Sequence, residues 1–396
     1  MKYVWVLAFG LGAASLARAE PVVTIRNNGP AENRLNFVIV GDGYTAGDLV
    51  KYSTDVDLLV QRMFEQSPYA EYARYFNVLR VDVTSNQSGA SHPETGVTRD
   101  TAFGAAYNCG GIQRTICVNT ASVNAVVARS VPPEARDLIL VLVNDSQYGG
   151  SGGSVIVGST AAQVVELVLH EMGHTLGLLG DEYSDSPPAC INTTEPAQVN
   201  IARDIGRQSI KWASWIDPST SLPTPGTAAA VPGAYEGANY CVSGLYRPTY
   251  NSKMRSLGNP FDQVNTEQLI LRIYNFVLPY DSASPSDASV TSTCGELANF
   301  FVQPLSTSRG ELGVTWRVDG IVAGTGDELK LDTNALALGA HAIDVEVRDP
   351  TSAVRRDPRD ALVERRHWDL TVAVAPVAHR EILGFPELSR CLGTSR

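Results

Sequence analysis

The most restrictive feature of the chain is the pentapeptide His170-Glu-Met-Gly-His174. Histidines four residues apart lie on one face of a helix, so both imidazoles can reach the same metal ion. Glu171, beside the first histidine, can reach a metal-bound water rather than the metal itself. Apolar residues at 164, 165, 168 and 169 indicate a helix over about residues 160–176 that packs on a sheet. We therefore expect a fold built around a buried helix that carries a zinc site.

The residues after this helix contain candidates for a third ligand. Gly177 is expected to end the helix in a left-handed turn, which lets the chain reverse towards the metal. Catalytic zinc takes three protein ligands plus a water. Asp181 is our prediction for the third ligand and Glu182 is the alternative. Either carboxylate can instead orient a histidine ring.

The first half of the chain alternates between strand and helix patterns. Residues 36–40, 76–83 and 138–143 are predicted strands, and residues 46–66 carry apolar side chains at helical spacing. This order is typical of an α/β domain with a mixed sheet.

The middle of the chain is less periodic. Residues 184–250 are rich in Pro, Ser, Thr and Gly, so we expect long loops with one helix near residues 196–208. A second helix is predicted over residues 265–276. The composition of residues 282–286 is typical of a linker, which predicts a first domain over residues 20–281.

The C-terminal region, residues 282–396, has an all-β pattern with Trp316 in the middle of a strand. Short strands separated by turn signals predict a small immunoglobulin-like β-sandwich. The predicted strands are residues 300–304, 312–318, 328–331, 342–347 and 367–374.

The N-terminus has the pattern of a signal peptide over residues 1–19. Lys2 precedes an apolar stretch over residues 3–16, and Ala17-Arg18-Ala19 matches a cleavage site. No later stretch has the length and hydropathy of a membrane span. We therefore predict an exported protein that is secreted or periplasmic. We also expect it to be a monomer.

Charge excludes two classes of partner. The chain has a net charge of −11 at pH 7 and no basic block. Nucleic acids and anionic membranes would repel such a chain, so neither is expected as a partner.

Six cysteines in an exported chain predict three disulfides. The simplest pairing by position is Cys109 with Cys117, Cys190 with Cys241, and Cys294 with Cys391. A zinc site made of cysteines is disfavoured because the chain contains no Cys-x-x-Cys pair.

Beyond the pentapeptide, the residues resemble known peptidases. The pattern from His170 to Gly177 is similar to that of metzincins, but position 180 is glycine where many metzincins place a third histidine.

The longer string over residues 170–183 resembles the bacterial IgA-peptidase family of metallopeptidases instead. Residues 40–44, 236–240, 244–248 and 253–255 are also similar to segments of that family. The resemblance covers roughly residues 34–280, and it implies a metzincin-like zinc peptidase domain in which Met254 forms a Met-turn beneath the metal.

The expected activity is that of a zinc endopeptidase with one catalytic Zn²⁺ and a protein or peptide substrate. Zinc held by His170, His174 and Asp181 would activate a water, and Glu171 would take its proton and pass it to the leaving amine. The candidate donors to the oxyanion are Tyr246, Arg247 and Tyr250.

The strand over residues 154–158 is expected to be an edge strand that pairs with an extended substrate. A plain edge strand without that role is the alternative. Two other functions also stay open: a zinc amidase or deacetylase acting on cell-wall or glycan amides, and a surface-binding protein with an inactive peptidase domain.

Overall fold

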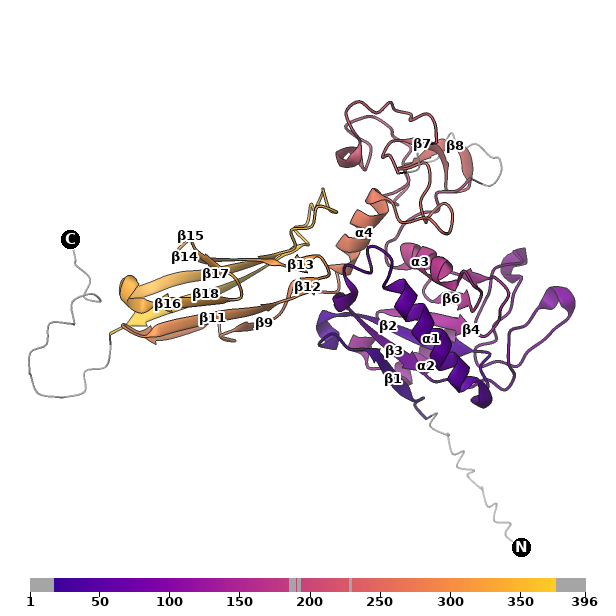
Figure 1. Ribbon diagram of the computed structural model, residues 1–396, viewed down its shortest axis with the longest axis horizontal. Coiled ribbons are helices and arrows are strands. Elements are labelled where there is room, and N and C mark those ends of the chain that lie inside the picture. Colours follow the sequence, from indigo (N-terminus) through magenta and orange to yellow (C-terminus); the bar gives the residue numbers. More distant parts are fainter. Residues whose placement is uncertain (1–17, 185–189, 191–193, 228–229, 375–396) are drawn as a thin grey trace, which may run out of the picture.

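A computed structural model describes residues 18–184, 190, 194–227 and 230–374. Figure 1 shows an α/β domain, a lobe that contains β7 and β8, and a β-sandwich that extends to one side. Residues 1–17 of the predicted signal peptide lie outside the described ranges. Within those ranges, no helix has the length and hydropathy to cross a bilayer.

The α/β domain is built on a six-stranded mixed sheet. Its strands β2, β3, β4 and β6 run parallel, and β1 and β5 at the two edges run antiparallel to their neighbours. The order is β1 (Val22–Arg26), β3 (Phe76–Val81), β2 (Leu35–Asp42), β4 (Leu138–Val143), β6 (Ile156–Ser159) and β5 (Gly150–Ser151). The mixed α/β architecture predicted from the sequence is confirmed.

Helices cover both faces of this sheet. The side chains of Phe37 and Ile39 share a buried cluster with α1 (Leu49–Met63) and α3 (Val164–Thr175). On the other face, Val38 packs with α2 (Thr120–Ser130). Because β2 is buried on both faces, it reads as a continuous apolar run rather than an alternating one.

The lobe after α3 differs from the prediction. The structure has no helix over residues 196–208. The ammonium of Lys211 donates hydrogen bonds to the backbone carbonyls of Pro196, Gln198 and Ile201. Those carbonyls are therefore satisfied without the N–H groups of a helix, which explains how an irregular segment is stable there.

Two of the three predicted disulfides are present. Cys109 is bonded to Cys117, and Cys190 to Cys241, with Cα–Cα distances of 5.6 and 5.7 Å. The second bond ties the segment after α3 to the first residue of β8 (Cys241–Arg247). Cys391 lies outside the described residues, so its pairing with Cys294 stays a prediction.

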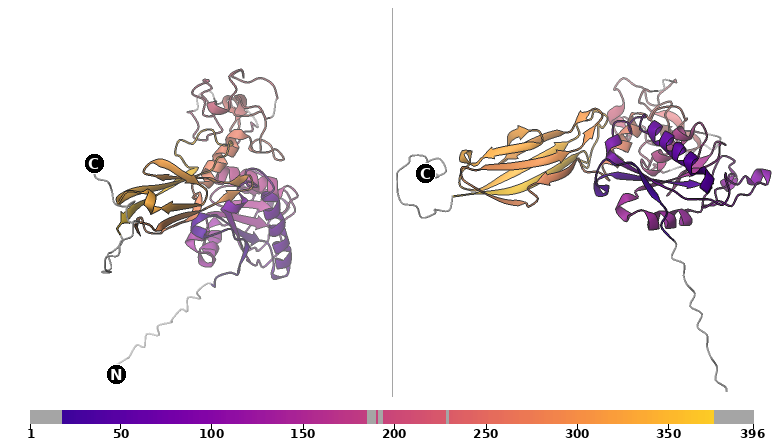
Figure 2. Two further views of the ribbon diagram at one scale, coloured as in Figure 1. Left: turned by 60° about the vertical axis from the view of Figure 1, so that its left-hand side comes forward. Right: turned by 60° about the horizontal axis from the view of Figure 1, so that its bottom comes forward.

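The C-terminal region forms two packed sheets, whose strands run away from the α/β domain in the right-hand view of Figure 2. Trp368 lies 5.3 Å from Phe300 and 5.9 Å from Trp316 between ring centroids, and all three side chains are buried between the sheets. One sheet has the order β10 (Ser289–Thr293), β18 (Val363–Ala373), β17 (Gly339–Arg348), β14 (Gly313–Val318) and β15 (Ile321–Thr325), and the other has the order β16 (Glu328–Asp332), β11 (Leu297–Pro304) and β9 (Tyr280–Ser284).

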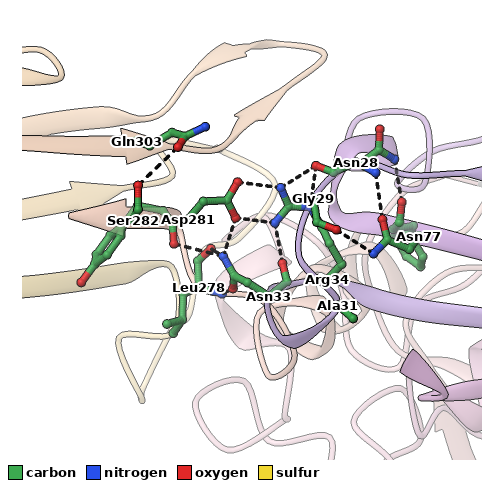
Figure 3. Close-up of polar contacts among 12 residues, drawn as sticks. Asn28, Gly29, Ala31, Asn33, Arg34, Asn77, Leu278, Asp281, Ser282 and Gln303 are labelled. Carbon is green, nitrogen blue, oxygen red and sulfur yellow. Dashed lines mark hydrogen bonds and ion pairs between the residues drawn. The ribbon is translucent and has the colours of Figure 1, made fainter. Parts of the chain in front are cut away.

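The segment predicted as a linker is instead part of the sandwich. Residues 280–284 form β9, which pairs with β11. Asp281 in β9 accepts two parallel hydrogen bonds from the guanidinium of Arg34, at 2.6 and 2.8 Å, as Figure 3 shows. Since the side chain of Arg34 is 3% exposed, this buried bidentate pair fixes the strand to the α/β domain.

A second buried contact joins the two parts of the molecule. The carboxylate of Asp349, which follows β17, accepts hydrogen bonds from the hydroxyls of Tyr72 and Tyr274 at 2.6 and 2.8 Å. Tyr274 directly follows α4 (Gln263–Ile273). The sandwich therefore packs against the end of α4, and Arg272 of α4 donates to the carbonyl of Leu176, which directly follows α3, at 2.8 Å.

Candidate metal centre

The helix α3 brings both histidines to the floor of a cavity. Its residues from Leu167 to Gly173 are buried, and Val168 and Leu169 belong to the main hydrophobic core. Burial of this apolar face leaves His170 and His174, one turn apart, facing the same point. The separation between their Nε2 atoms is 3.1 Å.

The turn after α3 is formed differently from the prediction. Leu178, not Gly177, has the left-handed backbone, with φ of 54°. The Leu178 N–H donates to the carbonyl of His174, which is the bond of an αL cap, and the Leu179 N–H donates to the carbonyl of Gly173. Glycine is needed at position 177 for a different reason, because a Cβ there would lie 2.6 Å from the carbonyl oxygen of Gly173.

This turn brings Asp181 to the two histidines. Its Oδ1 atom lies 3.2 Å from the Nε2 of His170 and 3.2 Å from the Nε2 of His174. The three atoms form a nearly equilateral triangle. Two ligand atoms of a tetrahedral zinc site are separated by about 3.3 Å, so the triangle has the size of one face of that tetrahedron.

The hydrogen bonds of the two imidazoles support a cation at this point. The Nδ1 of His170 lies 3.0 Å from the carbonyl of Lys253, and the Nδ1 of His174 lies 2.8 Å from the carbonyl of Leu179. Since a carbonyl can only accept, each Nδ1 carries the hydrogen and each neutral ring presents a lone pair at Nε2. Asp181 Oδ1 is buried and has no hydrogen-bond partner among the described residues. Three acceptors that converge in this way fit a bound metal ion.

The electrostatics of the three groups favour positive charge at the same point. Burial by itself lowers the pKa of His174, but the attraction of the Asp181 carboxylate, whose Oδ1 lies 3.2 Å away, outweighs burial and raises that pKa to about 9. Burial likewise tends to raise the pKa of Asp181, but the close approach of the two imidazoles holds it far below its usual value. The site therefore attracts a cation, for which protons and metal ions compete.

Tyr240 contacts the other oxygen of Asp181. Its hydroxyl donates to Oδ2 at 2.8 Å and accepts from the hydroxyl of Tyr183 at 2.9 Å. Oδ2 is thereby engaged and Oδ1 is left free for the metal. We did not predict this contact, because 59 residues separate the two partners.

The backbone at Tyr240 is strained. Asn239 and Tyr240 have φ of 50° and 67° and form the two-residue turn between β7 (Tyr235–Ala238) and β8. A turn with both central residues left-handed strongly favours glycine at its second position. A tyrosine there costs about 1 kcal/mol, which indicates that its side chain is needed at the site.

Glu182, the alternative ligand, does not reach the triangle. Its carboxyl is fully buried on the opposite side of the chain, where Oε1 accepts from the side-chain amides of Asn200 and Asn265 at 2.9 and 3.0 Å. Oε2 accepts from the hydroxyl of Ser252 at 2.5 Å. Successive residues of an extended chain point in opposite directions, so only Asp181 faces the histidines.

The three predicted oxyanion donors also lie outside the cavity among the described residues. The guanidinium of Arg247 is buried against the backbone carbonyls of Glu236 and Gly237. The ring of Tyr250 lies beside the guanidinium groups of Arg247 and Arg255. Tyr246 pairs through its backbone with Ala202. These side chains stabilise the lobe, and we withdraw the three predictions.

A cavity of about 590 Å³ lies over the triangle. Glu171 faces it, and burial raises the pKa of its carboxyl. Gly152 lies so close that a Cβ added there would be 2.3 Å from Glu171 Oε2. Glycine at position 152 therefore gives this carboxylate its space.

The strand next to the cavity is not the one predicted. β6 lies inside the sheet between β4 and β5, and its residues Val157 and Gly158 are paired on both sides. The last strand of the sheet is the short β5, and its residues Gly150 and Ser151 line the cavity. The prediction of an edge strand over residues 154–158 is therefore wrong.

Met254 is fully buried beneath α3. A Cβ added at Gly173 would lie 2.4 Å from its sulfur. The sulfur therefore packs against α3 at Gly173, which lies between the two histidines in the sequence. The carbonyl of Met254 accepts from the Glu182 N–H at 2.9 Å, and the preceding carbonyl orients His170. The turn at residues 253–254 therefore positions both His170 and the segment that carries Asp181.

Comparison with known proteins identifies the family. The family model of IgA Peptidase M64 matches residues 23–231, which is more than half of the chain. The chain belongs to the IgA Peptidase M64 family. The family resemblance predicted from the motifs is confirmed, and this M64 protein is a metallopeptidase whose substrates are proteins or peptides.

No curated protein matches this M64 chain. Among solved structures, fibronectin(III)-like modules of Clostridium thermocellum CbhA match 24% of this chain and 98% of their own length. The identity is 20% and the TM-score is 0.18. That TM-score carries no argument about fold or function.

Proposed function

We propose that this M64 protein is an exported zinc endopeptidase with a metzincin-like catalytic domain. The observation that carries the proposal is the triangle of His170, His174 and Asp181, whose three lone-pair atoms lie 3.1 to 3.2 Å apart beside Glu171. Imidazole and carboxylate ligands of this number are typical of catalytic zinc. When bound there, zinc supplies a Lewis acid that lowers the pKa of a water and polarises the substrate carbonyl.

Within this proposal, Glu171 moves the proton. Its carboxylate takes the proton of the attacking water and delivers it to the nitrogen of the leaving amine. A raised pKa brings a carboxyl closer to the value at which it can both accept and return a proton near neutral pH. Tyr240 keeps Asp181 oriented, and Met254, in the role of a Met-turn, keeps α3 and the ligands in place.

Removal of the metal tests the proposal. We expect one zinc per purified chain and cleavage of an unbiased peptide library. A strong chelator should lower the rate of cleavage at least about 100-fold, and stoichiometric Zn²⁺ should restore it. Cleavage that persists in protein with less than a tenth of a zinc per chain would overturn the zinc assignment.

The contact between Gly152 and Glu171 gives a second prediction. Gly152→Ala should lower kcat about 10- to 100-fold, because a displacement of a catalytic group by about 1 Å has that effect. The thermal unfolding midpoint should not fall, since φ at position 152 is not in the left-handed region. Steady-state kinetics and thermal denaturation measure both quantities.

Gly47→Ala is the matched control for this variant. The nearest atom to a Cβ at position 47 is 3.7 Å away, and its backbone is also not left-handed. We expect wild-type kcat for this control. Equal kcat for Gly152→Ala and wild type would show that the close approach at position 152 does not constrain Glu171.

Family membership favours peptide hydrolysis over the amidase or deacetylase function that the motif alone allowed. The complete set of ligands and Glu171 also argues against an inactive domain that only binds a surface. Export is proposed from the sequence of residues 1–19 and is supported by the two disulfides.

A further inference from the structure

The loop closed by the Cys109–Cys117 disulfide forms one wall of the cavity. Its backbone continues the sheet beyond β5: the Gly150 N–H donates to the carbonyl of Arg114 at 3.0 Å, and the Ile116 N–H donates to the carbonyl of Gly150 at 3.4 Å. The hydroxyl of Ser151 also donates to the carbonyl of Ile116 at 2.7 Å. The disulfide and these bonds hold the position of the loop.

This loop limits how a substrate can pair with the sheet. The outward-facing backbone groups of Gly150 are already bonded to the loop. Gly152, the residue after β5, lies beside Glu171 and forms no backbone hydrogen bond to the loop in the described part of the chain. An extended substrate can therefore hydrogen-bond to this edge only close to the scissile bond, and the loop side chains meet it there.

One of those side chains is a cation without a partner. Arg114 lines the cavity, and in the described part of the chain its guanidinium forms no hydrogen bond or ion pair. Glu171, Tyr148 and Tyr240 line the same cavity, so the guanidinium borders the space that a substrate beside Glu171 would occupy.

The other charges of the cavity wall are already engaged. Lys253 forms an ion pair with Glu166, and Arg255 donates to the carbonyl of Tyr250 at 2.7 Å. The carboxylates that line the cavity are Glu171 and Asp181, both with assigned roles. In a chain of net charge −11, this wall therefore holds a guanidinium, that of Arg114, without a carboxylate partner among the described residues.

We propose that Arg114 binds a carboxylate of the substrate, so that the preferred substrates are polypeptides with a carboxylate close to the scissile bond. Arg255 lines the same cavity and adds positive charge. A guanidinium binds a carboxylate through two parallel hydrogen bonds, which gives both affinity and orientation. An acidic side chain and a free C-terminus share this chemistry. The inference rests on the proposed peptidase function and names its substrate class.

The test uses synthetic peptides built around one cleaved sequence found in the peptide library. One arm places Glu or Gln at single positions on either side of the scissile bond, and the other arm compares free and amidated C-termini. In one of the two arms, we expect wild-type protein to cleave the best peptide that carries the carboxylate with a kcat/KM about tenfold higher than that of its neutral counterpart. The difference should lie mainly in KM. The arm that shows the preference identifies the source of the carboxylate.

Variants at position 114 assign the preference to this residue. Arg114→Gln should reduce the ratio of kcat/KM between carboxylate and neutral peptides to below about twofold, and Arg114→Glu should invert it. The backbone bonds of the loop do not involve this side chain, so both variants should fold. Arg317→Gln is the control, because Arg317 is exposed on the sandwich, and it should retain the wild-type ratio.

Three results would overturn the inference. Wild-type protein that cleaves all peptides equally has no carboxylate preference. Arg114→Gln protein that loses the same factor on every peptide uses Arg114 to support Glu171 and not to select substrates. Failure of wild-type, zinc-loaded protein to cleave any peptide would overturn the peptidase proposal itself, and is distinguished from the first result by the absence of product.

Discussion

Glu171→Gln should bind zinc as wild-type protein does and lose turnover, with kcat lower by about 10²- to 10⁴-fold. Glutamine has nearly the same shape as glutamate, but its amide cannot accept the proton of the attacking water. His170, His174 and Asp181 keep all of their contacts, because none of their hydrogen bonds and ion pairs among the described residues involves the side chain of Glu171. Zinc content by elemental analysis and peptide cleavage by mass spectrometry check the two halves of this expectation.

The control for this variant is Glu134→Gln. Glu134 is exposed, and its side chain does not line the cavity, so kcat should be unchanged. Retention of wild-type turnover by Glu171→Gln would remove Glu171 from the mechanism. Loss of zinc together with turnover would instead give it a role in holding the metal.

Asp181→Asn should lower the affinity for zinc at least about 100-fold. The substitution removes the negative charge that attracts the metal cation, while an amide of the same size preserves the packing of neighbouring side chains. Since Oδ1 has no other partner among the described residues, little else should change in the folded protein. Competition with a chromophoric chelator measures the affinity, and circular dichroism checks that the variant is folded.

Two neighbouring variants separate this role from the alternatives. Tyr240→Phe removes only the hydrogen bond to Oδ2 and should weaken zinc about 10- to 100-fold. Glu182→Gln keeps an oxygen that can accept from Asn200 and Asn265, so zinc affinity should stay near the wild-type value. A large loss of zinc in Glu182→Gln, with none in Asp181→Asn, would reverse the assignment of the third ligand.

Local patterns were sufficient for the parts of the fold that depend on short-range order. The strands of the sheet core and the helix α3 were recognised because burial on one or both faces sets the period of apolar residues. Residues 138–143 match β4 at both ends. Helix α2 was missed because only three of its eleven residues are buried, so its apolar pattern is weak.

Long-range contacts explain the predictions that did not hold. The segment over residues 196–208 is irregular because Lys211 satisfies its carbonyls. β6 is an internal strand because the short β5 pairs with it, and two residues are too few to give a strand pattern. Residues 282–284 belong to a strand because Asp281 is held by Arg34, which lies 247 residues away.

The sequence by itself determined the family, the α/β architecture and the two histidines with Glu171, because a helix places residues four apart at one point wherever it lies in the fold. Only the tertiary structure decided between Asp181 and Glu182, since that choice depends on the direction in which a turn presents each carboxylate. It also revealed Tyr240, Gly152 and Arg114 at the site. These residues come from separate segments, and only packing brings them together around the helix.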